Sequence, residues 1–336
     1  IVLCGISLIF TSGIRWNVGA DWSPYFDFFS ENQTWSQFIY GDFEFGYAIL
    51  NYLVRVLTDE YTVFLFCMIA LIVCLKFETL YNYTPFPLLA LLLNFSSYVG
   101  DVFFVRQTIA MAIIFYSFKF IVEKKLGKFI CSIFLASSIH FSAIVFIFAY
   151  YIYYLKINVK LLSIFMILSI NIAYFDLMNE LIFFISTIGD VGKNIFIMKF
   201  IGYINLQEAG VHYGNIDPKT SLITGCLRRM IIVAVLLYYK KEISDRYNEY
   251  KGILNLLIFE LLLFAIIYPI SPVISRITGY YALFSILIIP SLFYVPKTIS
   301  GKLTFLIILI IYCAAKYINV IYDHYDHYVP FTTIFT

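Results

Sequence analysis

The sequence predicts an all-α protein that crosses a membrane many times. Of its 336 residues, 62% are hydrophobic and only 13% are charged, and the mean hydropathy is +0.87. Soluble domains carry about twice that share of charged residues. Apolar runs long enough to cross a hydrocarbon core of about 30 Å recur along the chain. These observations exclude a soluble globular protein, and the net charge of +2 does not indicate a nucleic-acid partner.

Apolar stretches that should meet the membrane cover most of the chain. They are residues 1–12, 61–77, 85–99, 102–122, 129–155, 161–175, 221–239, 252–270, 274–294 and 302–320. The expected architecture is one integral membrane domain over residues 1–336, a transmembrane helical bundle with about ten to twelve membrane segments.

The stretch 129–155 is predicted to form a hairpin of two short helices. Lysines lie at both of its ends, at Lys128 and Lys156, and cytoplasmic connectors are rich in Lys and Arg. A single crossing would place Lys156 outside and invert every later span. A hairpin of residues 129–138 and 140–153 keeps both ends in the cytoplasm. Its apex then carries His140, at a depth where non-helical backbone must be surrounded by protein or water.

This threading places two long segments on the outer side. Residues 176–220 are predicted to form a lid-like loop, and residues 13–60 an outer loop in which 45–57 form an amphipathic helix. All arginines except Arg246 fall on or near this side. Guanidinium groups grip phosphate in two places and stay charged when buried, so Arg106, Arg228 or Arg229, and Arg276 predict an anion site. The alternative is that each pairs with a nearby acid or reaches lipid headgroups.

The outer loop mixes carboxylates with aromatic rings. Asp21 and Glu44 lie among Trp22, Tyr25 and Tyr47, a combination that suits the apolar faces and hydroxyl rims of sugars, and a carboxylate can act as a base on a hydroxyl. The alternative for the rings is an interfacial aromatic belt. His140 is either a further catalytic base or a hydrogen-bonded core residue.

The motifs resemble those of the EpsG/Wzy family of bacterial polysaccharide polymerases. The resemblance rests on Arg-x-x-x-Gly-x-Asp-Trp-x-x-Tyr at 15–25, Glu-x-Gly-Tyr at 44–47, Arg-Gln-x-x-Ala at 106–110 and the lone His140. It covers about the first half of the chain, with Arg276 and the ending Tyr-x-x-Pro-Phe at 328–331 as weaker echoes.

The resemblance implies a metal-independent, GT-C-like glycosyltransferase in the bacterial inner membrane, with its active site facing the periplasm. Its donor and acceptor would be glycans on undecaprenyl diphosphate. Membrane lipid would surround it, a chain-length regulator is a further possible partner, and no cofactor is expected. The expected catalytic residues are Asp21, Glu44 and His140 as competing bases. The expected substrate-binding residues are Arg15, Trp22, Tyr25, Tyr47, Arg106, Gln107, Arg228, Arg229 and Arg276.

Two other functions remain open at this point. An O-antigen ligase would use the same donor and the same arginines but another acceptor. A lipid-linked oligosaccharide flippase belongs to a different class, for which internal repeats and charges along a central path are typical. The two halves of this sequence do not resemble each other, which favours the enzyme.

Overall fold

The computed structural model describes residues 2–19, 22–97, 106–156, 218–269, 274–323 and 325–335. In these ranges the regular structure is helical, apart from one isolated β-bridge between Arg15 and Thr333. The all-α prediction is therefore confirmed. The span predicted at 161–175, and all but the last residues of the lid predicted at 176–220, lie outside the described ranges.

The chain divides into two compact units. The first comprises residues 1–150, 245–249 and 286–336, and the second residues 151–244 and 250–285.

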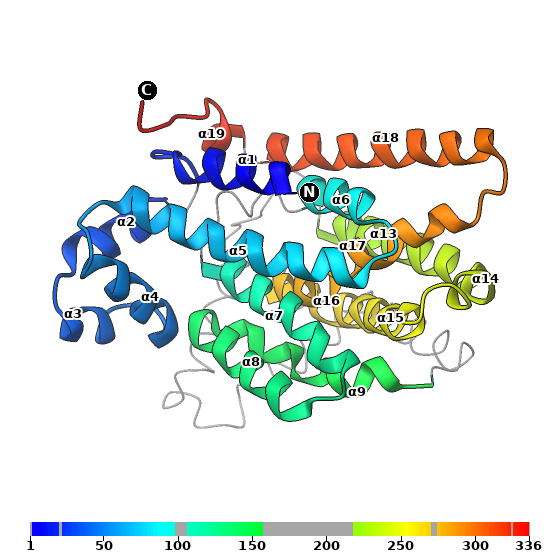
Figure 1. Cartoon of the computed structure of the whole chain (residues 1–336), viewed down its shortest axis with the longest axis horizontal. Helices are drawn as coiled ribbons and strands as arrows, with labels where there is room; N and C mark the ends of the chain where they lie inside the picture. Colours follow the sequence, from blue (N-terminus) through cyan, green and yellow to red (C-terminus); the bar gives the residue numbers. More distant parts are fainter. Residues whose placement is uncertain are drawn as a thin grey trace. The chain divides into compact units, whose positions relative to one another are not determined.

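The first unit holds most of the helices. They are α1 (Val2–Gly13), α2 (Trp22–Glu31), α3 (Trp35–Ile39), α4 (Phe45–Arg55), α5 (Tyr61–Tyr83), α6 (Pro87–Ser97), α7 (Arg106–Val122), α8 (Leu126–Ile139), the 3-10 helices η2 (Phe141–Phe148) and η5 (Ile289–Tyr294), α18 (Ile299–Asp323) and α19 (Tyr325–Tyr328). Helices α1, α5, α7 and α8 pack side by side in that order, and α18 runs along α6 (Figure 1). Helix α7 packs against both α5 and α8, and its residues 108–115 are all buried, as expected of a helix that is apolar on every side.

The second unit is built around α15 (Tyr250–Ile267). Helix α13 (Pro218–Tyr238), the short α14 (Lys240–Ser244), η4 (Ile274–Thr278) and α16 (Gly279–Ala282) all pack against it. Two short helices, α9 (Ala149–Tyr154) and α17 (Ser285–Ile288), each run from one unit into the other along the chain.

Five described helical segments are long and apolar enough to cross a membrane. They are 61–83, 220–238, 250–267, 274–294 and 299–322. Four of them are continuous helices close to predicted spans. The fifth, 274–294, was predicted as one span and is a succession of short helical pieces, in which Pro290, the second residue of η5, has no amide hydrogen to donate.

The predicted hairpin at 129–155 is present. Helix α8 ends at Ile139, His140 is extended at φ −148° and ψ 108°, and η2 begins at Phe141. The chain then reverses, as ring contacts between the two arms show. The ring of Phe129 at the start of α8 lies 6.2 Å from that of Phe146 and 5.6 Å from that of Tyr150. The second arm differs from the expected single helix, since it is a 3-10 helix followed by α9.

Candidate active site around Glu44

Glu44 is the residue at which three motifs of the sequence meet. One carboxylate oxygen, Oε2, accepts a hydrogen bond of 2.6 Å from Nη1 of Arg106. The other, Oε1, accepts a hydrogen bond of 3.3 Å from the amide of Phe141 and lies 3.7 Å from Nδ1 of His140. The sequence separates these partners by 62 residues and more, so only the fold brings them together.

A close approach between α4 and α8 makes this meeting possible. Glu44 is the N-cap of α4, and Gly46 lies just inside that helix. A Cβ atom at Gly46 would collide with the Ser138 hydroxyl and would lie 2.9 Å from the Ser138 carbonyl group. Only glycine allows α4 to pack against the end of α8 in this way. Because α8 ends one residue later, His140 and the amide of Phe141 face Glu44 at the start of α4.

The environment of Glu44 keeps its carboxylate ionised. Burial opposes the charge, but the neighbouring His140 and the positive charge of Arg106 outweigh it and lower the pKa of Glu44 to about 2. The side chains of Glu44, Arg106 and His140 are 27%, 21% and 23% exposed, so the cluster is half-buried and reachable from outside. Nδ1 of His140 has no hydrogen-bond partner among the described residues.

Arg106 is held by rings as well as by Glu44. Its guanidinium carbon lies 4.7 Å from the ring of Phe43 and 5.9 Å from that of Tyr25, at cation–π distances. Gln107 follows it on α7 and is half-buried. Arg106 is therefore both paired and stacked, which fixes its position.

The aromatic residues expected to bind sugar are buried. Trp22, Tyr25 and Tyr47 belong to a cluster in which the Tyr25 and Tyr47 rings lie 5.6 Å apart and the Trp22 and Tyr61 rings 5.2 Å apart. These rings form part of the buried core, and the Tyr25 ring lies next to Arg106 of the Glu44 cluster. More exposed rings lie nearby in sequence, among them Trp16 and Trp35, which the sequence analysis did not single out.

Arg15 lies in the same unit and is almost fully buried, with 3% of its surface exposed. Its guanidinium carbon lies 5.6 Å from the ring of Trp22. Asp21, the remaining candidate base, lies outside the described residues.

The other predicted arginines belong to the second unit. Arg229 on α13 donates from Nε to Glu260 of α15 at 2.6 Å and from Nη1 to the Gly225 carbonyl, and it stacks at 3.6 Å on Phe264. Arg228 and Arg276 are exposed. Arg106 and these three arginines thus fall in different units, and their joint site remains a prediction.

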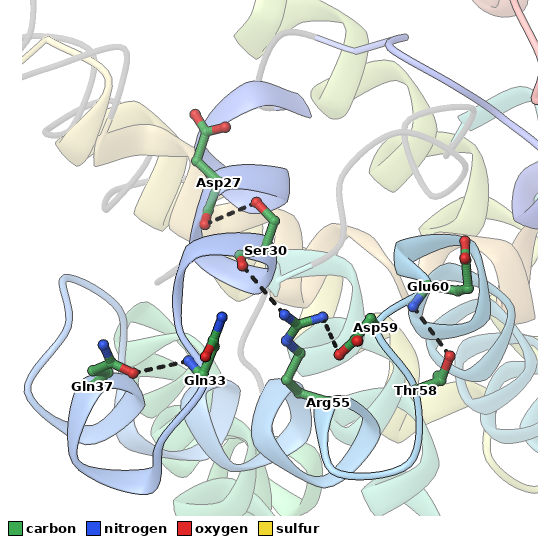
Figure 2. Close-up of polar contacts among 8 residues, drawn as sticks. All are labelled: Asp27, Ser30, Gln33, Gln37, Arg55, Thr58, Asp59 and Glu60. Atoms are coloured by element: carbon green, nitrogen blue, oxygen red, sulfur yellow. Dashed lines mark hydrogen bonds and ion pairs between the residues drawn. The ribbon is translucent and has the colours of Figure 1, made fainter.

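An ion pair at the far end of α4 was not predicted. Figure 2 shows Arg55 donating to Asp59 at 2.7 Å and to the Ser30 carbonyl at 3.5 Å, and its guanidinium also faces the Phe29 ring at 5.5 Å. The hydrogen bond to the Ser30 carbonyl ties α4 to α2. The four-residue spacing of Arg55 and Asp59 was the signal available in the sequence.

In the described part of the chain, no three His, Cys, Asp or Glu side chains gather so as to hold a metal ion. The metal-independent reaction stays a prediction, because it depends on what the site does when substrate is bound.

Comparison with known proteins identifies the family. The model of the EpsG family matches residues 1–333. No curated protein and no solved structure matches the chain. A family match of this extent supports a membrane protein with a function of the polysaccharide-polymerase type. The chain belongs to the EpsG family.

Proposed function

We propose that this protein is a polysaccharide polymerase that transfers a growing glycan from undecaprenyl diphosphate to the sugar of a new lipid-linked repeat unit. The reaction would take place at the outer face of the bacterial inner membrane. The observation that carries the proposal is the meeting of Arg106 and His140 at Glu44, because it joins a fixed cation, a base and a carboxylate in one half-buried site.

We assign the role of base to His140. A carboxylate with a pKa of about 2 is a weak proton acceptor at neutral pH, so Glu44 suits this role poorly. Glu44 is better suited to orienting and stabilising the imidazole of His140. Its Oε1 faces Nδ1 of that ring, which leaves Nε2 for the substrate. The 3.7 Å separation would shorten as the imidazole gains charge, because such contacts tighten in the reacting complex.

The chemical step follows from these roles. The acceptor hydroxyl gives its proton to Nε2 of His140, and its oxygen forms a bond to the anomeric carbon of the donor sugar. The bond from that carbon to the diphosphate oxygen breaks, and the electron pair leaves with the diphosphate. Negative charge grows on this leaving group in the transition state, where fixed arginines stabilise it more than in the ground state. Glu44 stabilises the imidazolium that results.

The test is the purified full chain with a synthetic lipid-linked repeat unit, with oligomers separated on a gel. His140→Gln is expected to lower the turnover rate about a hundredfold or more, as removal of a general base does. Glu44→Gln should lower it less and should shift the pH at which half of the rate is lost, because it changes the partner of the base and not the base itself.

The matched control is Ser137→Ala in the same hairpin. The Ser137 hydroxyl bonds to the Ile133 carbonyl of its own helix, so its loss should leave the rate unchanged. A stable His140→Gln protein that polymerises at the wild-type rate would refute the assignment. Oligomers formed without any lipid A core acceptor would support a polymerase over a ligase. If no oligomer forms under any condition, the result would favour a flippase or other transporter.

A further inference from the structure

Arg15 is a buried cation for which the described residues supply no counter-ion. It is 3% exposed, it forms no ion pair in the described ranges, and its Nη1 has no hydrogen-bond partner there. Arg55, Arg106 and Arg229 each have a carboxylate oxygen within 2.7 Å. Leaving a guanidinium unpaired away from water costs several kcal/mol. Arg15 therefore has unused capacity to bind an anion.

Two tyrosine hydroxyls near Arg15 are also buried without a hydrogen-bond partner among the described residues. The hydroxyl groups of Tyr47 and Tyr61 are buried and have no hydrogen-bond partner in the described part of the chain. Both phenols lie close enough to the Arg15 guanidinium to act on its charge. Burial raises the pKa of Tyr47, so its hydroxyl stays protonated and able to donate. Three unpaired donors thus lie in one region, and unpaired buried donors are rare in native structures.

The backbone around Arg15 is held by the far end of the chain. Arg15 forms an antiparallel bridge with Thr333. The Trp16 amide donates to the Thr332 carbonyl at 3.0 Å, and the Ile334 amide donates to the Ile14 carbonyl at 2.9 Å. These contacts fix the chain on both sides of the arginine, so its guanidinium is positioned in advance of any ligand.

We propose that Arg15, Tyr47 and Tyr61 form a subsite for a phosphate group of the lipid-linked substrate. A phosphate offers several charged acceptor oxygens, which match the fork of the guanidinium and the two hydroxyls. The choice of substrate rests on the proposed function.

The location of the subsite fits that reaction. The Tyr25 ring lies 5.6 Å from Tyr47 and 5.9 Å from the guanidinium of Arg106, so a single ring connects the subsite to the Glu44 cluster. A diphosphate is bonded directly to the anomeric carbon that reacts, so its subsite must adjoin the site that holds the base and the acceptor hydroxyl. Access requires the rings around Arg15 to part, and Trp16, 38% exposed and 5.4 Å from Trp22, is the ring of this group that faces outward.

The experiment measures binding to the full chain in nanodiscs of phosphatidylcholine, without an acceptor. The probes are undecaprenyl diphosphate, undecaprenol, which has no phosphate, and phosphatidylglycerol, whose phosphate belongs to an ordinary membrane lipid. The wild type should be stabilised against heat by the diphosphate and much less by the other two.

Arg15→Met should be at least as stable as the wild type without ligand, because an unpaired buried charge is removed. It should bind the diphosphate about tenfold to a hundredfold more weakly, the loss expected for hydrogen bonds to a charged group. The double variant Tyr47→Phe with Tyr61→Phe removes only the two hydroxyls. It tests the same subsite if Arg15→Met does not fold. Arg55→Met is the matched control and should keep the full response to diphosphate.

Wild-type affinity for diphosphate in Arg15→Met, or in the double tyrosine variant, would overturn the proposal. Equal stabilisation by phosphatidylglycerol would overturn the assignment to the substrate and identify a membrane headgroup as the occupant. Binding is read without catalysis. A protein that binds diphosphate through Arg15 but forms no polymer would therefore refute the proposed function and leave this subsite standing.

Discussion

Gly46→Ala tests whether the approach of α4 to α8 builds the site. The added Cβ would lie 2.9 Å from the Ser138 carbonyl group, whereas ordinary contacts begin at 3.4 Å, so the helices must separate by at least about 0.5 Å. Overpacking of this kind costs about 1–3 kcal/mol. Glu44 lies at the end of α4 that must move, and a misplacement of about 1 Å in a reacting group can lower the rate a hundredfold. We expect a loss of about tenfold or more in rate for this smaller shift.

The measurements are polymerisation by the purified protein and its thermal unfolding in detergent. Gly127→Ala is the matched control, because a Cβ at Gly127 on α8 meets nothing within 4 Å. It should change stability by less than about 1 kcal/mol and leave the rate unchanged.

A second variant separates the two parts of the contact. Adding Ser138→Ala to Gly46→Ala removes the hydroxyl collision but leaves the carbonyl group in place, so only partial recovery is expected. If Gly46→Ala behaves like Gly127→Ala in both measurements, the close contact is not what positions Glu44.

Three further predictions concern stability. Because folding lowers the pKa of Glu44 from 4.5 to about 2, its pairing should contribute on the order of 1–2 kcal/mol above pH 4.5, once solvent screening of this partly exposed site is allowed for, and lose this as the pH falls toward 2. The stability difference between wild type and Glu44→Gln should shrink over that range. Arg229→Met alone should destabilise the protein by about 3–5 kcal/mol because it removes the cation that lies 2.6 Å from the buried Glu260 carboxylate, while Arg229→Met with Glu260→Met should be close to neutral. Asn255→Leu should cost about 1–3 kcal/mol, since its amide donates to two carbonyls near the end of α9, at 3.1 and 2.7 Å.

Each of these has a result that would contradict it. A constant difference between wild type and Glu44→Gln from pH 6 to pH 2 would mean that the carboxylate is not stabilised by its neighbours. A double Arg229 and Glu260 variant as unstable as the single one would show that the pair does more than balance its own charges. If Asn255→Leu unfolds at the wild-type temperature, water or another donor must replace its amide.

Local pattern and charge were enough to predict much of the fold. The hairpin of residues 129–155 follows from lysines at both of its ends, and its break at His140 lies one residue after the predicted break. The helix predicted at 45–57 is present as α4 because its apolar residues recur at helical spacing. Both features depend on residues close together in sequence.

Contacts between distant segments could not be predicted in the same way. The spacing of Glu44, Arg106 and His140 in the sequence does not indicate that Arg106 and His140 both lie against the Glu44 carboxylate. That contact depends on how α4, α7 and α8 pack. The pairing of residues 14–16 with 332–334 involves a single isolated bridge, which is too short to leave a strand pattern in the sequence. Charge counting left open whether Arg106 and Arg229 bind an anion or pair with a nearby acid, and only the structure shows that each has an acid partner.

The pairing of residues 14–16 with residues 332–334 also bears on biosynthesis. The Thr332 hydroxyl donates to the carbonyl of Trp16, a residue 316 positions earlier. A nascent polypeptide therefore carries Arg15 through the synthesis of some 316 further residues before the segment that braces it emerges from the ribosome. Assembly of this region must wait for residues 332–334, and a chain terminated ahead of residue 332 would lack the contacts that brace Arg15.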